Sequence, residues 1–591
     1  MRFVLAIVSF IIAALLMGLG IAQKTIFAAP DEFTASTEIT TSAPVTVISG
    51  AALNAYPRSQ FVQISGSKEN FAAYGRTEDV IAWIGDTSYN RVDFDAEESN
   101  LVSTLKTGTE DQVPSPVDSD LWLASYTDKS AMTINVPEDF SLLVVTDGVK
   151  PAPSEISVTW PIDNSTPWAN TLVVAGGVML LVGLLLLFWA IAHIRKSRGP
   201  RRKSQKMPKL PKQPRYKPIK AKQKELEANA KGRRSLTSRV AIVPVVLVTA
   251  LTLGGCSTDF WAGREGVAQQ TATADPAAEA AEVAPVDPPA VTEKQAERII
   301  ADLAGVAATA DAAMDTDLVS TRFAGPALDL RLANYAARKA DASIPVVAPI
   351  PTGKVEVTLP QLTDNKWPRA VFAVIEDPTT TEDGKPLPQV AVMLTQEDPR
   401  AKYKAQYVIT LEPGAVIPPV APATIGAGRL QPDTKFLALA PQEIGAAYSD
   451  ILMNDAASPS NEVFEAEGDT LRTTYGLAFK EAEKAPFSAT STLTFAPSAA
   501  TGPLIALSTN DSNAIVAVNI NEDVTAAVVE AGAVVDSKGA VKALAGKPTS
   551  TKGFKATYGY QLLFFVPSND TGGKILLLGY TQGLVAASEL P

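Results

Sequence analysis

The stretch TLVVAGGVMLLVGLLLLFWAIAHI, residues 171–194, decides how the rest of the sequence is interpreted, because it contains no Asp, Glu, Lys or Arg. A helix of about 20 apolar residues is long enough to cross the hydrocarbon core of a bilayer. Trp168 precedes the stretch, and Phe188 and Trp189 lie near its other end, as aromatic side chains at membrane surfaces often do. We therefore predict a transmembrane helix over residues 171–194.

A strongly basic tract follows this helix directly. Residues 195–239 hold 18 Lys and Arg residues against two acidic ones, although the whole chain has a net charge of −11. Basic loops remain on the cytoplasmic side of a membrane. Five prolines between residues 200 and 218 oppose helix formation, so we expect an extended cytoplasmic loop. Its charge either sets the topology alone or also contacts anionic lipid head groups. We expect no nucleic-acid partner.

The beginning of the chain is also apolar. Residues 3–22 are an uncharged run of 20 residues, which is long enough to span a bilayer. Signal peptides have a shorter apolar region before a cleavage site with small residues, and Gly20-Ile21-Ala22 could serve as that site. Residues 1–22 are therefore predicted to be a transmembrane anchor or a signal peptide.

A third apolar segment, residues 240–256, ends at the only cysteine of the chain. VAIVPVVLVTALTLGG contains Pro244 and is only 16 residues long, which is short for a permanent span. It follows the basic stretch GRRSLTSR and ends in Leu253-Gly254-Gly255 before Cys256.

This order resembles a bacterial lipoprotein signal that ends in a lipobox. The resemblance implies that the thiol of Cys256 is acylated with diacylglycerol and that a signal peptidase cuts the Gly255–Cys256 bond. Lipoprotein signals normally begin at the N-terminus, so the position in mid-chain departs from that family. The alternative is that Cys256 ends an ordinary third helix. Two to three transmembrane helices are expected in total.

Between the first two apolar segments, residues 31–168 alternate apolar and polar side chains over short runs. Such runs, separated by turn residues, predict the strands of an extracytoplasmic all-β domain, a β-sandwich or small barrel. The runs are VTVIS (45–49), FVQIS (61–65), DVIAWIG (79–85), LWLASY (121–126), MTINV (132–136), FSLLVVTDGV (140–149) and ISVTW (156–160).

The region after Cys256 begins with a linker. Residues 257–291 are rich in Ala, Thr, Glu, Asp and Pro, a composition that predicts a disordered tether. Residues 292–295, TEKQ, then form a capping-box pattern at the start of a helix.

Helical periodicity followed by strand-like runs occurs twice in the remaining chain. This order predicts two α+β units, residues 292–430 and 436–591, with a boundary near 425–440. In element order alone, the layout resembles tandem NTF2-like or cystatin-like modules.

The composition excludes the catalytic groups of many common enzyme classes. One histidine, His193, and one cysteine exclude disulfide frameworks, Cys/His zinc sites and nearly every His-dependent triad. Ser103-Thr104-Leu105-Lys106 and Lys106-Thr107-Gly108 match two motifs of penicillin-recognising enzymes but share one lysine, which the real site does not permit. We predict no catalytic, cofactor-binding or metal-binding residues and no cofactor.

The whole layout resembles membrane-anchored envelope proteins of Gram-positive actinobacteria. We accordingly expect a non-enzymatic envelope scaffold or accessory protein in the cell membrane, with residues 23–168 and 257–591 outside the cell and 195–239 in the cytoplasm. The alternatives are a lipid- or glycan-binding carrier module and an envelope enzyme that uses carboxylates. An apolar cavity lined by few polar groups would favour the carrier.

Overall fold

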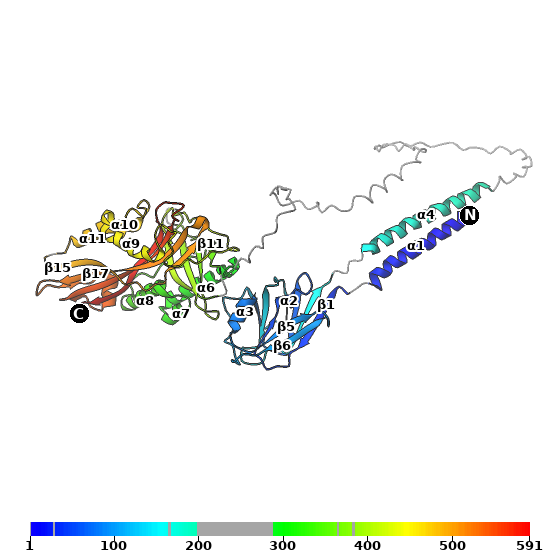
Figure 1. Cartoon of the computed structure of the whole chain (residues 1–591), viewed down its shortest axis with the longest axis horizontal. Coiled ribbons are helices and arrows are strands. Elements are labelled where there is room, and N and C mark those ends of the chain that lie inside the picture. Colours follow the sequence, from blue (N-terminus) through cyan, green and yellow to red (C-terminus); the bar gives the residue numbers. More distant parts are fainter. Residues whose placement is uncertain are drawn as a thin grey trace, which may run out of the picture. The chain divides into compact units, whose positions relative to one another are not determined.

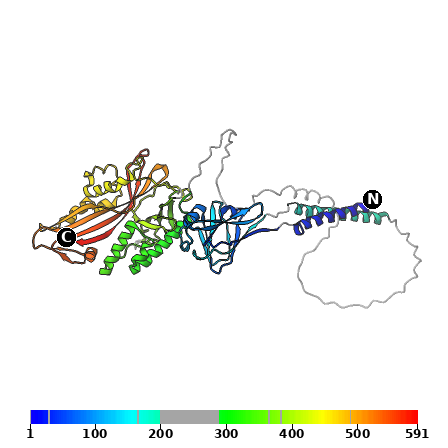
Figure 2. The same cartoon turned by 60° about the horizontal axis from the view of Figure 1, so that its bottom comes forward.

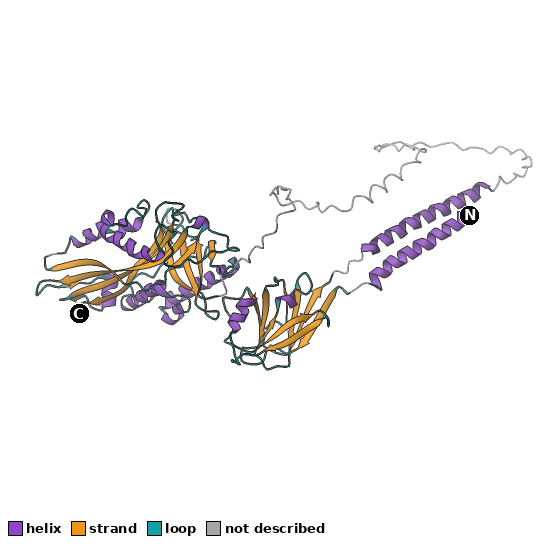
Figure 3. Ribbon diagram, in the orientation of Figure 1, coloured by secondary structure: helices purple, strands orange, loops and turns teal. Residues whose placement is uncertain are grey.

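The structure is a computed structural model in which residues 2–27, 30–162, 167–197, 288–362, 366–380, 384–487 and 489–591 are described. The chain divides into two compact units. The first consists of residues 1–17 and 174–285, and the second of residues 18–173 and 286–591. Figure 1 labels the elements, and Figure 3 shows that the second unit is rich in strands with a smaller number of helices.

Two helices are long and apolar enough to cross a bilayer, judged by length and composition. They are α1 (Arg2–Thr25) and α4 (Pro167–Ser197). In the first unit, a Cβ atom on Gly176 of α4 would lie 2.5 Å from the side chain of Met17 in α1. Glycine therefore permits the close approach of these two helices. The third apolar segment and nearly all of the basic tract and the tether lie outside the described residues.

Within the second unit, residues 32–161 form two sheets, and we refer to them as the β domain. The strand orders are β1-β10-β3-β8 and β6-β5-β2-β9-β4-β7. Side chains from both sheets, such as Val62 and Leu142, pack with Trp160 in one hydrophobic core. The strands are β1 (Glu32–Glu38), β2 (Val45–Ile48), β3 (Gln60–Ser65), β4 (Phe71–Arg76), β5 (Tyr89–Asp95), β6 (Asn100–Lys106), β7 (Ala124–Thr127), β8 (Ala131–Ile134), β9 (Phe140–Val145) and β10 (Glu155–Pro161), with a short helix α2 (Gly50–Leu53).

One strand predicted for the β domain is a helix. We expected DVIAWIG, residues 79–85, to be extended, and the structure has helix α3 (Thr77–Ile84) there. Val80 and Trp83 are both buried, at the spacing of one helical face and not at alternate positions. Gly85, with a φ of 65°, ends the helix. The prediction was wrong because a short apolar run fits both periodicities.

The C-terminal domain, residues 288–591, begins with helix α6 (Glu293–Ala313). The hydroxyl of Thr292 accepts a hydrogen bond from the Gln295 amide at 3.3 Å, and the Gln295 side chain accepts one from the Thr292 amide at 3.0 Å. The predicted capping box is confirmed. The other helices are α7 (Thr316–Ser320), α8 (Gly325–Ala340), α9 (Pro441–Asn454), α10 (Thr470–Tyr475), α11 (Leu477–Lys484) and α12 (Gly539–Ala545), with 3-10 turns η1 (Asp455–Ala457) and η2 (Asn510–Ser512).

The main sheet of this domain has nine strands in the order β11-β12-β13-β14-β21-β20-β17-β15, with β16 also paired to β17. Every pairing in it is antiparallel. The strands are β11 (Val355–Pro360), β12 (Arg369–Ile375), β13 (Val390–Gln396), β14 (Lys404–Leu411), β15 (Ser491–Ser498), β16 (Ile505–Ser508), β17 (Ala514–Val528), β20 (Gly553–Val566) and β21 (Leu576–Glu589), while β18 (Val535–Asp536) and β19 (Thr549–Ser550) form a separate pair.

The sheet crosses the expected boundary between two α+β units. Thr410 and Leu411 of β14 pair with Tyr580 and Gly579 of β21, so strands of both expected units belong to one sheet. The pairing satisfies main-chain groups that an edge strand would leave open. A pairing between segments so distant in sequence leaves no local pattern from which to predict it.

The two ends of this sheet are covered differently. In the closed half, strands β11 to β14, helices α6 and α8 cover one face, and apolar side chains such as Ile505 and Leu507 cover the other. In the open half, the outer parts of β15, β17, β20 and β21, most side chains are only half-buried. Figures 1 and 2 show α6, α7 and α8 on one side of the sheet and α9, α10 and α11 on the other.

Candidate ligand-binding cavity

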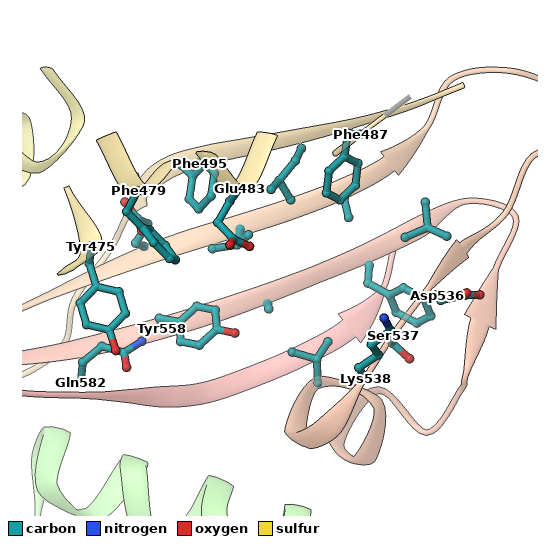
Figure 4. A pocket seen from close by; sticks show the side chains of 18 of the residues that line it. Tyr475, Phe479, Glu483, Phe487, Phe495, Asp536, Ser537, Lys538, Tyr558 and Gln582 are labelled. Atoms are coloured by element: carbon teal, nitrogen blue, oxygen red, sulfur yellow. The ribbon is translucent and has the colours of Figure 1, made fainter. Parts of the chain in front are cut away.

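A cavity of about 650 Å³ lies on one face of the open half. Its walls come from four strands of the sheet, from helices α10 and α11, and from the β18–α12 segment. Figure 4 shows Phe479, Glu483 and Phe487 along one side, with Ser537 and Lys538 toward the end away from Tyr475. The volume lies within the range of about 300–1,000 Å³ that is usual for small-molecule sites.

The floor of the cavity consists of side chains at alternate strand positions. Val524 and Ala526 of β17 line it, as do Ala556 and Tyr558 of β20. Because successive side chains of a strand point to opposite faces, these residues share one face of the sheet. Leu493 and Phe495 of β15, and Phe554 and Tyr560 of β20, extend the same face.

Aromatic side chains from the helices form the wall. The ring of Tyr475 at the end of α10 lies 5.6 Å from that of Phe479 in α11 and 6.0 Å from that of Tyr560, both edge to face. Phe487 follows α11 and is half-buried against the same cavity. The fixed edge-to-face geometry gives this wall a defined shape.

A buried charged cluster closes the inner end. Lys480 Nζ lies 2.8 Å from Glu522 Oε1, and its side chain is 1% exposed. The same ammonium donates to the carbonyl oxygens of Tyr475 at 2.6 Å and Leu452 at 3.2 Å. Burial lowers the pKa of Lys480, whereas hydrogen bonding to Glu522 opposes that shift. The carboxylate and the ammonium therefore satisfy each other.

The tyrosines around this cluster remain protonated at neutral pH. Burial raises the pKa of Tyr475 and of Tyr558. Burial and the nearby Glu522 carboxylate together raise the pKa of Tyr560, whose hydroxyl lies 3.4 Å from Glu522 Oε2. Their hydroxyls are thus neutral hydrogen-bond donors beside an otherwise apolar surface.

The remaining polar side chains of the cavity are few. Glu483, Asp536 and Lys538 are exposed, while Gln582 is half-buried on β21. Among the residues that the structure describes, no group of three or more His, Cys, Asp or Glu could hold a metal ion. The arrangement can enclose an apolar or aromatic group and offer charge of either sign near its edge.

The residues singled out in the sequence do not contribute to this cavity. Leu253, Gly254, Gly255 and Cys256 lie outside the described residues. The paired motifs at 103–108 lie at the exposed end of β6 and just beyond it.

The carboxylate of Asp315 serves as the N-cap of α7, where it accepts hydrogen bonds from the amides of Asp317 and Leu318. That arrangement gives the carboxylate a structural role.

Sequence reasoning missed the cavity because its wall was not predicted. No element was predicted for residues 470–484, although Tyr475 and Phe479 stand four residues apart, which is helical spacing. On β20, the alternation of Phe554, Ala556, Tyr558 and Tyr560 was a further signal. Together these two patterns could have indicated an aromatic surface.

These features define a domain in which helices flank one extended antiparallel sheet that carries an aromatic cavity. The sequence model of a protein family described as Domain of unknown function (DUF8094) matches residues 287–589, slightly more than half of the chain. The chain therefore belongs to this family. No curated protein and no solved structure matches it significantly. The matched range includes both halves of the nine-stranded sheet.

Proposed function

We propose that this protein is a membrane-anchored envelope protein whose C-terminal domain binds the apolar part of a lipid in the cavity of the open half. The observation that carries this proposal is the lining of that cavity, where Phe, Tyr, Val, Leu and Ala side chains from one sheet face meet an aromatic wall. Burying apolar surface stabilises by about 25 cal/mol per Å². An acyl chain would gain this stabilisation along the whole floor.

The polar groups favour a lipid over a glycan. A sugar presents hydroxyls on every side and needs many hydrogen-bond partners, because an unpaired buried polar group costs about 1–3 kcal/mol. In this cavity Glu522 is already engaged with Lys480, and Phe495 and Val524 offer no such partner. A lipid needs polar contacts only at its head group, and Glu483 and Lys538 are exposed where such a group could reach them.

The membrane assignment rests on α1 and α4 together with the basic tract at 195–239. In this proposal the tract is cytoplasmic, and the β domain and the C-terminal domain are outside the cell. Acylation of Cys256 would add a lipid anchor near the start of the tether. Both anchors would keep the cavity close to a source of lipid.

A scaffold role is the second candidate. In that role, buried ion pairs between the β domain and the C-terminal domain, such as Arg322–Asp120, would hold the two domains in one orientation. Ligand binding and a scaffold role make different predictions for the cavity, because only the first requires it to be open.

Photocrosslinking of the full-length protein tests the proposal. Membranes that contain the protein are loaded with a fatty acid that carries a diazirine, irradiated, and digested for mass spectrometry. We expect adducts on cavity residues such as Phe487 and Phe495, in addition to adducts on α1 and α4 if these helices span the membrane.

A pair of variants makes the result specific. Ala526→Trp places an indole on the cavity floor and should remove most cavity adducts. Ala527→Trp makes the same change one position further on, where the side chain points to the opposite face, and should leave the adducts unchanged. Labelled α1 and α4 without any label in the cavity would contradict lipid binding and leave the scaffold as the better candidate.

A further inference from the structure

The β domain and the C-terminal domain belong to the same compact unit and share buried polar contacts. Asp120, in the turn before β7, is 2% exposed. Its carboxylate receives two hydrogen bonds from Arg322 of the C-terminal domain, from Nη1 at 2.5 Å and Nη2 at 3.1 Å. The amide of Tyr403 donates a third at 2.7 Å. Such a two-point pairing between guanidinium and carboxylate fixes orientation as well as distance.

A second ion pair has the same polarity. Asp79 of helix α3 accepts a hydrogen bond at 2.7 Å from Arg369 of β12, whose side chain is fully buried. The guanidinium of Arg369 also stacks on the ring of Trp367 at 3.7 Å. That indole packs against the hydrophobic core formed by Trp83 and Trp122 of the β domain. Apolar contact and ion pair therefore occur together.

Further donors of the C-terminal domain reach main-chain oxygens of the β domain. Arg298 Nη2 donates to the Trp122 carbonyl at 2.6 Å, and Gln295 Nε2 donates to the Leu121 carbonyl at 3.0 Å. Arg400 donates from Nε to the Trp83 carbonyl at 2.9 Å and from Nη2 to the Ile84 carbonyl at 2.8 Å. In one contact the direction is reversed, since Arg76 of the β domain donates to the Pro289 carbonyl at 2.9 Å.

The two surfaces are complementary in charge. The β domain contributes the buried carboxylates, Asp79 and Asp120, and the C-terminal domain contributes Arg369 and Arg322. Asp79 also forms an ion pair with Arg76 of its own domain at 2.8 Å. Charges taken out of water are tolerated only when they are paired. An incorrect partner that lacked these carboxylates would leave Arg369 buried without a counter-charge and Arg322 with only Asp302 at 3.4 Å.

We infer that the C-terminal domain carries a specific docking surface for the β domain, and that this contact holds the two domains together without the covalent link between them. The partner of the surface is defined by its chemistry: two carboxylates placed to meet Arg322 and Arg369, beside main-chain carbonyl oxygens that accept hydrogen bonds. The linking segment then serves to keep the domains near each other, and the contact determines how they associate. A cut between the domains would leave them bound.

The test uses the full chain with a recognition sequence for a site-specific protease inserted between Ala274 and Asp275. The protein is held on a resin through an N-terminal tag in detergent, the linking segment is cut, and release of the C-terminal fragment is followed over time. We expect the fragment to be retained, also at 0.5 M NaCl, because buried ion pairs are screened less than exposed ones.

Asp120→Asn should increase the rate of release on the order of a hundredfold, since truncation of a buried charge pair acts mainly on dissociation. Asp93→Asn is the matched control, because Asp93 forms an exposed ion pair with Arg91 in the same domain. The C-terminal fragment of Asp93→Asn should be released at the same rate as that of the wild type. Prompt release of the wild-type fragment, or retention of Asp120→Asn equal to that of the wild type, would overturn the inference.

A variant in the C-terminal domain distinguishes loss of the contact from misfolding of the β domain. Arg322→Gln should accelerate release to a similar extent, and the double variant Asp120→Arg with Arg322→Asp should recover part of the retention. Tryptophan fluorescence of each uncut variant reports on the β domain core, where Trp83, Trp122 and Trp160 are buried. If Asp120→Asn changes the fluorescence, the rate of release measured for Arg322→Gln decides whether the inference holds.

Discussion

The closed and open halves of the nine-stranded sheet have the same strand geometry, but their faces are covered to different extents. In β12 and β13 every residue is buried, and apolar side chains cover both faces. Beyond Glu522, β17 has only half-buried residues, and one face borders the cavity. The closed half is therefore expected to provide stability, while the open half keeps apolar surface uncovered, which is the surface that the proposed ligand would contact.

Substitution of two phenylalanines, one in each half of the sheet, should give the largest difference in the free energy of unfolding. Phe372→Ala in the closed half should lower the free energy of unfolding by about 3–5 kcal/mol, because Phe372 is fully buried and its removal leaves a cavity. Phe495→Ala in the open half should cost about 1 kcal/mol or less, since the ring is already half-exposed. Urea denaturation of both variants measures the difference. Equal losses would contradict the division into a closed and an open half.

The buried ion pair of the open half should give the next largest effect. Glu522→Gln leaves the Lys480 ammonium almost fully buried without a counter-charge and should lower the free energy of unfolding by about 2–3 kcal/mol. Lys480→Met added to Glu522→Gln removes the stranded charge and should recover part of the loss. Thermal unfolding of the three proteins checks this, and no recovery in the double variant would show that Glu522 acts through something other than Lys480.

The smallest effect concerns alkaline pH and the closed half. Burial raises the pKa of Tyr407 well above its usual value, and its hydroxyl donates to the Pro503 carbonyl at 2.6 Å. Above about pH 10 the unfolded chain loses this proton and the folded chain keeps it, so the free energy of unfolding falls as the pH rises. Tyr407→Phe should cost about 1 kcal/mol at pH 8 and show a shallower fall at pH 10.5. The midpoints of urea unfolding of both proteins at pH 8 and pH 10.5 measure this difference.

Local features of the fold could be predicted, and features that depend on distant segments could not. The runs at 61–65 and 156–160 lie within β3 and β10, and the capping box at Thr292 starts α6 as expected. These signals depend on a few neighbouring residues. The joining of β14 to β21 depends on two segments far apart, so the expected boundary at 425–440 had no sequence pattern to contradict it.

The candidate cavity was missed for a related physical reason. On β17 the apolar alternation that predicts a strand is lost after Ile520, where Asn521, Glu522 and Asp523 follow one another. The strand nevertheless continues to Val528, because pairing with β15 and β20 supports it on both sides. A half-buried sheet face that borders a cavity therefore has a weaker pattern than a core strand.

The short pairing of β14 with β21 has a consequence for the order of assembly during synthesis. Until residues 576–589 have emerged, β20 presents an open row of amide and carbonyl groups, and the end of β14 at Thr410 and Leu411 is unpaired on one side. Exposed edges of this kind recruit other strands and promote aggregation. A chain that stalls before β21 is therefore prone to aggregate with other chains. We expect such truncated chains to depend on chaperones or to be degraded.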